Sequence, residues 1–339
     1  MPVITKPNLH FDATTYTGTD GVAGSVTGVG FQPDFVWGKR RSVNASHTLY
    51  DAVRGATKEI YSDLTNAEGT NSNGLTAFNS DGFSYGVSSA LSQGSIVAWC
   101  WKANGAGSTN TAGSITSQVS ANPTAGFSVF TFNSGASGTQ TVGHGLGAYP
   151  GMVIFKDRGV SGYWSVWHSA FSNPAQSYMY LDLTNAVGAD ASQWSNTAPT
   201  SSVFTYNSGY SFNANRNMLA YAWAPIAGYS AFGSYTGNGS ADGPFVYLGF
   251  RPRFVMIKRT DTSGTDWILL DSSRDPTNVV DQYLAANLSD AETVYANDKV
   301  DFLSNGFKQR GTASGQNGSG GTFIYMAFAE APFKYSSAR

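Results

Sequence analysis

The chain has 339 residues, which is enough for two or three domains of ordinary size. Charged residues make up only 12% of it and the formal net charge is −2, so it carries neither the basic surface of a nucleic-acid-binding protein nor the cationic segment of a protein that binds anionic membranes. Aromatic residues reach 14% beside 39 glycines, a combination that favours strands and tight turns, and we expect an all-β fold.

The first segment, MPVITKPNLH, lacks the apolar stretch of a secretory signal peptide, and no apolar run approaches the roughly 18 residues of a membrane span. A single cysteine, Cys100, excludes an internal disulfide framework. We therefore expect synthesis in a reducing cytoplasm, no membrane insertion and no cofactor.

Taken in chain order, the predicted strands form one set of phrases that occurs three times. The first copy runs through FDATTYTGTDG, GFQPDFVWGKRR, SDLTNAEGT, AFNSDGFSYG and IVAWCWKA, and the same order returns from Phe127 and from Tyr229. Each copy holds short β-branched or aromatic runs separated by Gly, Pro or Asn-Ser-Gly turns. We predict three tandem antiparallel β-sandwich domains of jelly-roll or lectin-like type, at residues 1–102, 125–226 and 227–339.

Between the first two copies lie about 15 extra residues, within ANGAGSTNTAGSITSQVSANPT at residues 103–124. This segment is rich in Gly, Ser, Thr and Asn and has no apolar periodicity, so it is predicted to be a flexible or surface-laid linker. The first domain is accordingly expected to be mobile beside a stiffer second and third pair.

The last phrase of each copy alternates large and small side chains, as in a strand packed on one face. Aligning IVAWCWKA, MLAYAWAP and IYMAFAEAP places Cys100 opposite Ala222 and Ala329, which predicts a small core residue. The same alignment places Glu330 where the other copies have Trp101 and Trp223, and this position is predicted to lie near a rim.

Three tryptophans of the second copy are candidates for an exposed aromatic platform that stacks on a sugar ring or a protein partner: Trp164, Trp167 and Trp194. A buried core role is the alternative. Trp164 and Trp167 have opposite parity, so in a strand one would face inward and one outward.

A D-x-x-R spacing occurs in the first copy as Asp51 and Arg54 and in the third as Asp271 and Arg274. We interpret both as structural ion pairs that fix a loop, rather than as catalytic carboxylates. The middle copy has His168 at the aspartate position. GFSYG at Gly82 fits a hydrolase elbow only in its letters, because no strand-to-helix context surrounds it. We predict no catalytic residue and no metal site, and leave open calcium in the loop DSSRDPTN.

The phrases YTGNGSADGPFVYLGFRPRFVMIKRTD, DWILLDSSRDP and VDFLSNGFKQRG with GGTFIYMAFAEAPF resemble a domain of unknown function that recurs in virion proteins of tailed, often marine, bacteriophages. The likeness is specific over Tyr235 to Phe333 and extends more loosely to the first two copies, which suggests the domain in three tandem copies. The resemblance implies a protein of the phage particle associated with tails or fibres, and it brings no catalytic residues with it.

These observations favour a non-enzymatic structural protein of the virion, first of all a tail-fibre or adhesion component that contacts a host-surface glycan or protein. The alternative is a capsid decoration, a head fibre or another tail-structural protein. A polysaccharide-degrading enzyme would need two acids converging in a cleft. Other virion proteins are expected partners, within a homo-oligomer set by particle symmetry, and nucleic acid is not.

Overall fold

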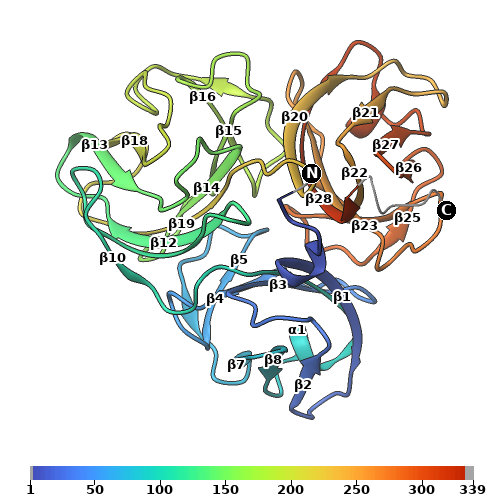
Figure 1. Cartoon of the computed structure of the whole chain (residues 1–339), viewed down its shortest axis with the longest axis horizontal. Helices are drawn as coiled ribbons and strands as arrows, with labels where there is room; N and C mark the ends of the chain where they lie inside the picture. Colours follow the sequence, from blue (N-terminus) through green and yellow to red (C-terminus); the bar gives the residue numbers. More distant parts are fainter. Residues whose placement is uncertain (1–2, 333–339) are drawn as a thin grey trace.

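The computed structural model describes residues 3–332, with side chains as far as Glu330. Antiparallel strands dominate this range, which confirms the predicted all-β fold, and its helical turns are Pro7–Leu9 (η1), Ser89–Ser92 (α1) and Ser314–Asn317 (α2). Figure 1 shows three lobes around a common centre, each drawn from one stretch of the chain. We call them the N-terminal unit (residues 3–102), the middle unit (residues 103–226) and the C-terminal unit (residues 227–332).

Each unit contains one large antiparallel sheet, and the order of its strands recurs in all three units. In the N-terminal unit the order is Phe11–Gly18 (β1), Gly94–Trp101 (β9), Phe35–Arg40 (β3), Thr48–Asp51 (β4), Lys58–Tyr61 (β5) and Gly69–Thr70 (β6). In the middle unit it is Ser108–Asn110 (β10), Ser117–Asn122 (β11), Phe127–Asn133 (β12), Asn217–Trp223 (β19), Met152–Asp157 (β14), Ser165–His168 (β15), Ser177–Tyr180 (β16) and Gly188–Ala189 (β17). In the C-terminal unit it is Ser230–Thr236 (β20), Thr322–Pro332 (β28), Phe250–Arg259 (β22), Ile268–Asp271 (β23), Gln282–Ala285 (β24) and Thr293–Val294 (β25).

A small antiparallel sheet accompanies each large one. Its strands are Gly24–Thr27 (β2), Gly82–Tyr85 (β8) and Leu75–Asn79 (β7) in the N-terminal unit, Gly138–Gly143 (β13) and Val203–Ser208 (β18) in the middle unit, and Phe245–Tyr247 (β21), Gly306–Gln309 (β27) and Val300–Leu303 (β26) in the C-terminal unit. A separate apolar cluster fills each unit, and side chains of its large and its small sheet both contribute to it.

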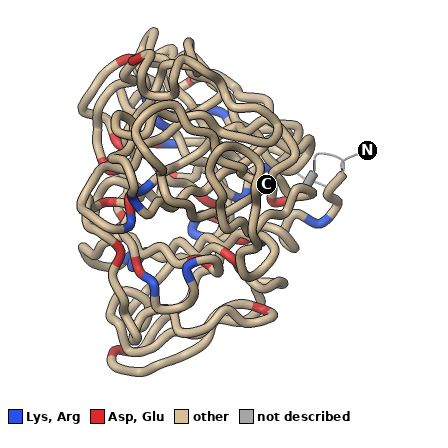
Figure 2. The backbone as a smooth tube through the Cα atoms, turned by 90° about the vertical axis from the view of Figure 1, so that its left-hand side faces the viewer, with Lys and Arg blue, Asp and Glu red and all other residues tan. Residues whose placement is uncertain are grey.

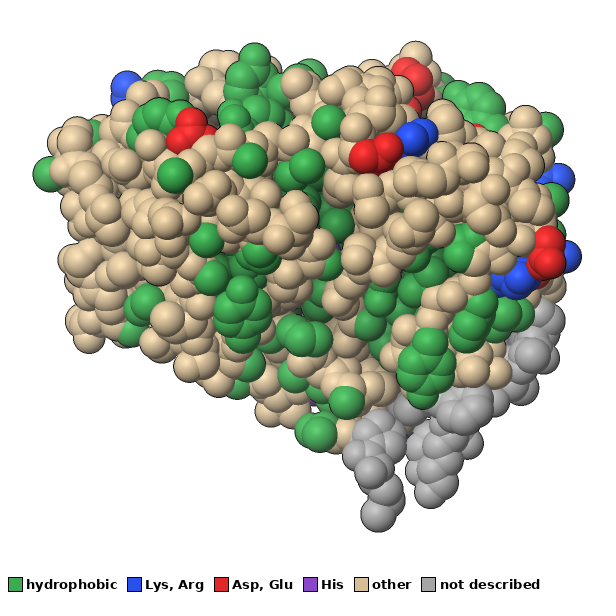
Figure 3. Space-filling view, turned by 90° about the horizontal axis from the view of Figure 1, so that it is seen from above, with side chains coloured by type: hydrophobic (Ala, Val, Ile, Leu, Met, Phe, Trp, Pro, Cys, Tyr) green, Lys and Arg blue, Asp and Glu red, His purple; other side chains and the backbone are tan. Residues whose placement is uncertain are grey.

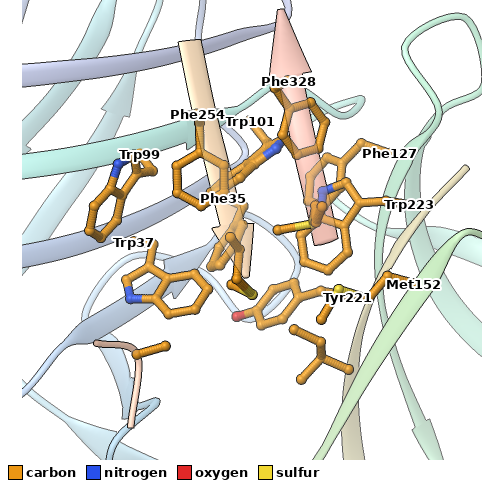
Figure 4. Close-up of a cluster of buried hydrophobic side chains, with 14 of the residues drawn as sticks. Phe35, Trp37, Trp99, Trp101, Phe127, Met152, Tyr221, Trp223, Phe254 and Phe328 are labelled. Carbon is orange, nitrogen blue, oxygen red and sulfur yellow. The ribbon is translucent and has the colours of Figure 1, made fainter. Parts of the chain in front are cut away.

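The other face of every large sheet is buried as well, because all three sheets contribute to one central core. Side chains alternate along a strand, so in β3 Val36 joins the cluster of its own unit while Phe35 and Trp37 join the central core. Figure 4 shows aromatic side chains from all three units meeting there, such as Trp101, Trp223 and Phe328. A sheet covered on both faces is apolar at nearly every position, as the burial of β3, β14 and β22 shows.

The pairing registers give the equivalence between units directly. Phe35, Met152 and Phe254 occupy equivalent positions in β3, β14 and β22. They pair with Trp101, Trp223 and Phe328, respectively, so these three partners are equivalent as well. The expected match of Trp101 to Glu330 is therefore wrong by two residues. The register of β22 and β28 shifts on both sides of Pro252, and Glu330 is left without a partner in the ladder. By the same register, Ala327 rather than Ala329 is the equivalent of Cys100, which is fully buried as predicted.

Residues 103–124 run mostly along the surface, which is one of the two outcomes predicted for this segment, but they do not form a flexible linker. They contain β10 and β11, and β11 pairs along its whole length with β12, from Ser117 opposite Phe132 to Asn122 opposite Phe127. The segment thereby extends the large sheet of the middle unit by two strands.

Three buried lysines at equivalent positions each bind a neighbouring unit, and we call these contacts the lysine clasps: Lys39, Lys156 and Lys258. Each donates from Nζ to a backbone carbonyl in the equivalent loop of another unit, and the acceptors are Ser289 O at 3.0 Å, Thr65 O at 2.7 Å and Thr184 O at 3.5 Å, respectively. Burial lowers the pKa of each lysine to about 8. The clasps run from the N-terminal to the C-terminal unit, from the middle to the N-terminal and from the C-terminal to the middle, so they close a ring.

A closed ring with a common core contradicts the expectation of a mobile first domain. The N-terminal unit is held by the middle unit through Lys156 and by the C-terminal unit through its own Lys39. Its Phe35 ring also stacks on Tyr221 of the middle unit, with 4.1 Å between ring centres.

Candidate functional site

The three candidate tryptophans do not form an exposed platform, because Trp164, Trp167 and Trp194 are all fully buried. Trp164 belongs to the central core, and Trp167 and Trp194 belong to the cluster of the middle unit. Opposite parity does separate Trp164 from Trp167, but both faces of the sheet are covered, so neither side chain reaches solvent. Each indole N–H donates to a backbone carbonyl at 2.8 Å, in order those of Tyr61, Pro174 and Ser177.

Both D-x-x-R pairs are present as fully buried ion pairs. The Arg274 Nε lies 2.6 Å from the Asp271 carboxylate, and Arg54 and Asp51 are arranged in the same way. Burial alone would lower the pKa of the Arg54 guanidinium, but Asp51, Tyr221 and Glu68 raise it above its ordinary value.

The two pairs also accept hydrogen bonds from side chains of other units, so their role in the fold is to join neighbouring units. The Tyr221 hydroxyl donates to Asp51 at 2.9 Å, and the Trp99 indole donates to Asp271 at 3.0 Å. At the third junction, between the middle and C-terminal units, His168 takes the place of the aspartate, and its Nε2 lies 3.1 Å from the Tyr325 carbonyl.

Figure 2 shows basic and acidic positions close together along the chain, with neither sign covering the visible face.

Exposed aromatic side chains do occur in the middle unit, but they are tyrosines. Residues 160–163, Ser165, Tyr180 and residues 210–213 are among those that line a cleft of about 190 Å³, which we call the tyrosine cleft. Tyr163 is 52% exposed and Tyr210 is 54% exposed at its mouth. The Tyr163 and Tyr180 rings lie 5.0 Å apart, and Tyr178 adds a third ring 5.5 Å from Tyr180. The Tyr210 hydroxyl donates to the carboxylate of Asp190.

A second cleft, which we call the acidic cleft, lies in the C-terminal unit. Residues from the segments 264–268, 283–298 and 313–315 enclose about 240 Å³. Its walls carry the rings of Tyr283 and Tyr295, 5.1 Å apart and nearly perpendicular, and the carboxylates of Asp266 and Asp298. Burial, and then the negative charge of Asp266, raise the pKa of Asp298 to about 6.

The two clefts occupy equivalent places. The backbone N–H of Trp164 donates to Asp182, and that of Trp267 donates to Asn287, so these two tryptophans correspond and fix both walls in the same way. The residue before each tryptophan faces the cleft, which is Tyr163 in one unit and Asp266 in the other. Each cleft is bounded on its other side by the loop that leads from the small sheet to the last strand of the large sheet.

No three His, Cys, Asp or Glu side chains gather as a metal site within residues 3–332. In the loop considered for calcium, Asp271 is held by Arg274, and Asp275 accepts hydrogen bonds from the backbone N–H groups of Asp281 and Gln282. Among the same described residues no helix is long and apolar enough to cross a membrane.

The fold and the clefts define an all-β protein whose three units close around one aromatic core and whose second and third units carry equivalent clefts. The chain belongs to the family described as Domain of unknown function (DUF7483), whose model matches residues 6–332. The family domain is thus matched once across all three units. Comparisons with curated proteins and with solved structures give no match.

Proposed function

We propose that the protein is a non-enzymatic structural component of a tailed bacteriophage particle that contacts the host surface, as a tail-fibre or adhesion protein does. The observation that carries the proposal is the tyrosine cleft, where the rings of Tyr163, Tyr180 and Tyr210 line one cavity and those of Tyr163 and Tyr210 are half exposed. Rigid amphipathic rings provide contact area at a low cost in conformational entropy, and polar groups beside them bind hydroxyls. A host-surface glycan fits this combination.

The rest of the surface supports binding without long-range charge attraction. Figure 3 shows a face made mostly of uncharged polar groups, with separate apolar groups and few charges. The Tyr247 side chain, 65% exposed on β21 in the small sheet of the C-terminal unit, provides an exposed tyrosine outside either cleft.

The acidic cleft brings two carboxylates together, as an enzyme acting on polysaccharides would require. Both oxygens of Asp266, however, accept hydrogen bonds inside the wall, from the Tyr283 hydroxyl at 3.0 Å and from the Asn287 amide at 2.8 Å. This supports a role for Asp266 in shaping the cleft and favours binding over catalysis.

The finer architecture is part of the same proposal. Three homologous antiparallel β-sandwich repeats at residues 1–102, 125–226 and 227–339 would explain the recurring strand order and the three equivalent lysines. The mature protein would then lie in the virion, in an oligomer set by particle symmetry and next to other virion proteins.

The test is binding of the purified chain to a panel of bacterial surface polysaccharides, measured by biolayer interferometry. Replacing Tyr163→Ala together with Tyr210→Ala is expected to weaken binding by about tenfold or more, because two stacking faces are lost. Tyr247→Ala is the matched control and should bind like the unmodified chain. An adhesion role is contradicted if no polysaccharide binds or if gold-labelled antibody locates the protein over the head of intact particles, which would favour capsid decoration.

A further inference from the structure

The acidic cleft has chemistry different from that of the tyrosine cleft, although the two are equivalent in the fold. Where the middle unit presents Tyr163, the C-terminal unit presents Asp266, and Asp298 adds a second carboxylate to the same cavity. A cavity of about 240 Å³ with two aromatic walls suits one small ring of a ligand.

The aromatic walls are set at right angles. The Tyr283 and Tyr295 rings meet at 84°, and Tyr295 remains 47% exposed at the mouth, while Tyr283 is fixed by the bond from its hydroxyl to Asp266. A ligand in the cleft therefore meets the face of at least one ring, whose negative face attracts a cation as well as the C–H groups of a sugar.

Asp298 is the group whose bonding is incomplete. Its backbone N–H donates to the Tyr295 carbonyl at 3.2 Å, but within residues 3–332 no side-chain or backbone donor reaches its carboxylate. Such a half-buried carboxylate depends on water for its hydrogen bonds, so a ligand that brings a positively charged donor can replace that water with a charge-assisted bond.

The chain supplies no such cation to the cavity. The described lining contains no Lys, Arg or His. Three basic groups around it are already bonded. Lys258 binds the Thr265 hydroxyl at 3.1 Å, and Arg310 is paired with Asp301 at 3.2 Å. Arg259 is paired with Asp261 at 2.9 Å and donates to the Ser314 carbonyl at the edge of the cleft. Lys299 is next to Asp298 in the sequence and is not among the lining residues.

We infer that the acidic cleft binds an amino sugar with a free ammonium group, the ammonium lying between Asp298 and Asp266 and the sugar ring against Tyr295. Hydroxyls of Thr293 and Ser314 in the lining are available to the sugar hydroxyls. The inference rests on the proposed function, of which it names a second ligand class, and it makes the chain bivalent for surface glycans.

The affinity should depend on pH. The groups facing Asp298 are Asp266, Tyr283, Tyr295 and the more exposed Asp290, with Lys258 and Arg259 bonded behind the wall and at its edge. The ammonium favours the ionised carboxylate, and Asp298 takes up a proton as the pH falls through about 6. Since the amine of a sugar ring itself loses its proton near neutral pH, binding should be strongest at about pH 6.5 and weaken both toward pH 5 and at alkaline pH.

The experiment compares the β-1,4-linked trisaccharides of glucosamine and of N-acetylglucosamine by isothermal titration calorimetry with the full chain. At about pH 6.5, where most of the amines and of the Asp298 carboxyl are charged, glucosamine trisaccharide is expected to bind at least about tenfold tighter, and Asp298→Asn should remove this preference. Tyr247→Ala, which changes an exposed tyrosine outside both clefts, should leave the preference unchanged, and thermal melts verify that each variant is folded.

Equal binding of the two trisaccharides, or a preference that survives in Asp298→Asn, would overturn the inference. If glucosamine trisaccharide fails to bind while panel polysaccharides bind through the tyrosine cleft, the inference falls and the adhesion proposal stands. If glucosamine trisaccharide binds and no panel polysaccharide does, the amino-sugar site is supported and the role of the tyrosine cleft in adhesion is contradicted.

Discussion

His168 shows how one residue adapts the third junction of the ring. Its Nδ1 accepts the backbone N–H of Ala170 at 3.1 Å, and its Nε2 lies 3.1 Å from the carbonyl of Tyr325 in the C-terminal unit. Both contacts are satisfied only by the neutral ring that carries its proton on Nε2. Burial lowers the pKa of His168 to about 4, so the side chain is neutral at pH 7.

Acid should destabilise the protein through this residue. Between pH 6.5 and 4 the unfolded state binds the proton and the folded state does not, so stability is complete above pH 6.5 and falls as the pH drops. The loss attributable to His168 is on the order of 3 kcal/mol. His168→Asn, which keeps an acceptor for the Ala170 N–H, should lose less free energy of unfolding over this range, measured by urea denaturation. Identical pH profiles for the two proteins would contradict this role.

Residue types alone predicted some local partners and not others. The spacing of Asp51 and Arg54 is short enough that one turn of chain brings them together, and the ion pair is visible in the sequence. The burial of Trp164 is not, because Tyr61, which accepts its indole N–H, lies about a hundred residues away in another unit. Tyr163 lies in the loop just before β15, next to the buried Trp164, and no signal in the sequence separated it from other loop tyrosines.

At the scale of elements, the composition of residues 103–124 predicted a linker, whereas backbone pairing makes part of the segment a strand of the large sheet. Residues 103–124 are polar, yet β11 forms a ladder with β12 and places Val119 in the cluster of the middle unit. Hydrogen bonds of the backbone do not depend on side-chain type, so a Ser- and Thr-rich segment next to an open strand edge can extend a sheet.

Hydrogen exchange measures this pairing directly. The amides of Ser117–Asn122 that bond to β12 should exchange at least about a hundredfold more slowly than in an unstructured chain, since opening them breaks part of a sheet. Amides of the exposed turn at residues 136–137 provide the comparison within the same unit. Exchange in 117–122 as fast as in that turn would restore the linker interpretation.

The register of β28 escapes sequence alignment for a related reason. The alignment of the final phrases matches Pro225 with Pro332, but two extra residues precede the proline in the C-terminal unit. Around Pro252 one residue of each strand, Arg253 in β22 and Glu330 in β28, is left out of the ladder, and Glu330 forms an ion pair with Arg251. The alignment is in error by two residues, and such a shift leaves every side chain on the same face of the strand, so the alternation of large and small residues could not reveal it.

At the scale of the whole molecule, the units depend on one another. The strand phrases predicted three similar units, but they could not show that the large sheets share a core, because the contacts join residues far apart in the chain. The middle unit alone would expose Met152, Ile154 and Trp223, which are buried against the other two units. An apolar face of this kind favours association or a loosely packed state.

We therefore expect the isolated fragment 103–226 to lack cooperative thermal unfolding and a near-ultraviolet circular dichroism signal from fixed aromatic rings. The same fragment produced together with residues 1–102 and 227–339 should copurify with them. A sharp melting transition of the fragment alone would show that the units are independent domains.

The three lysine clasps bind carbonyl oxygens, which every residue possesses. No point substitution in the loops around Thr65, Thr184 or Ser289 can delete these acceptors, whereas loss of Lys39, Lys156 or Lys258 removes the donor. Substitutions in these loops are therefore compatible with an intact ring, whereas each lysine position requires a side chain that fits the buried space and donates a hydrogen bond. Proteins descended from this chain can therefore change the residues that line their clefts, and with them the ligands they bind, while the contacts that hold the three units together stay the same.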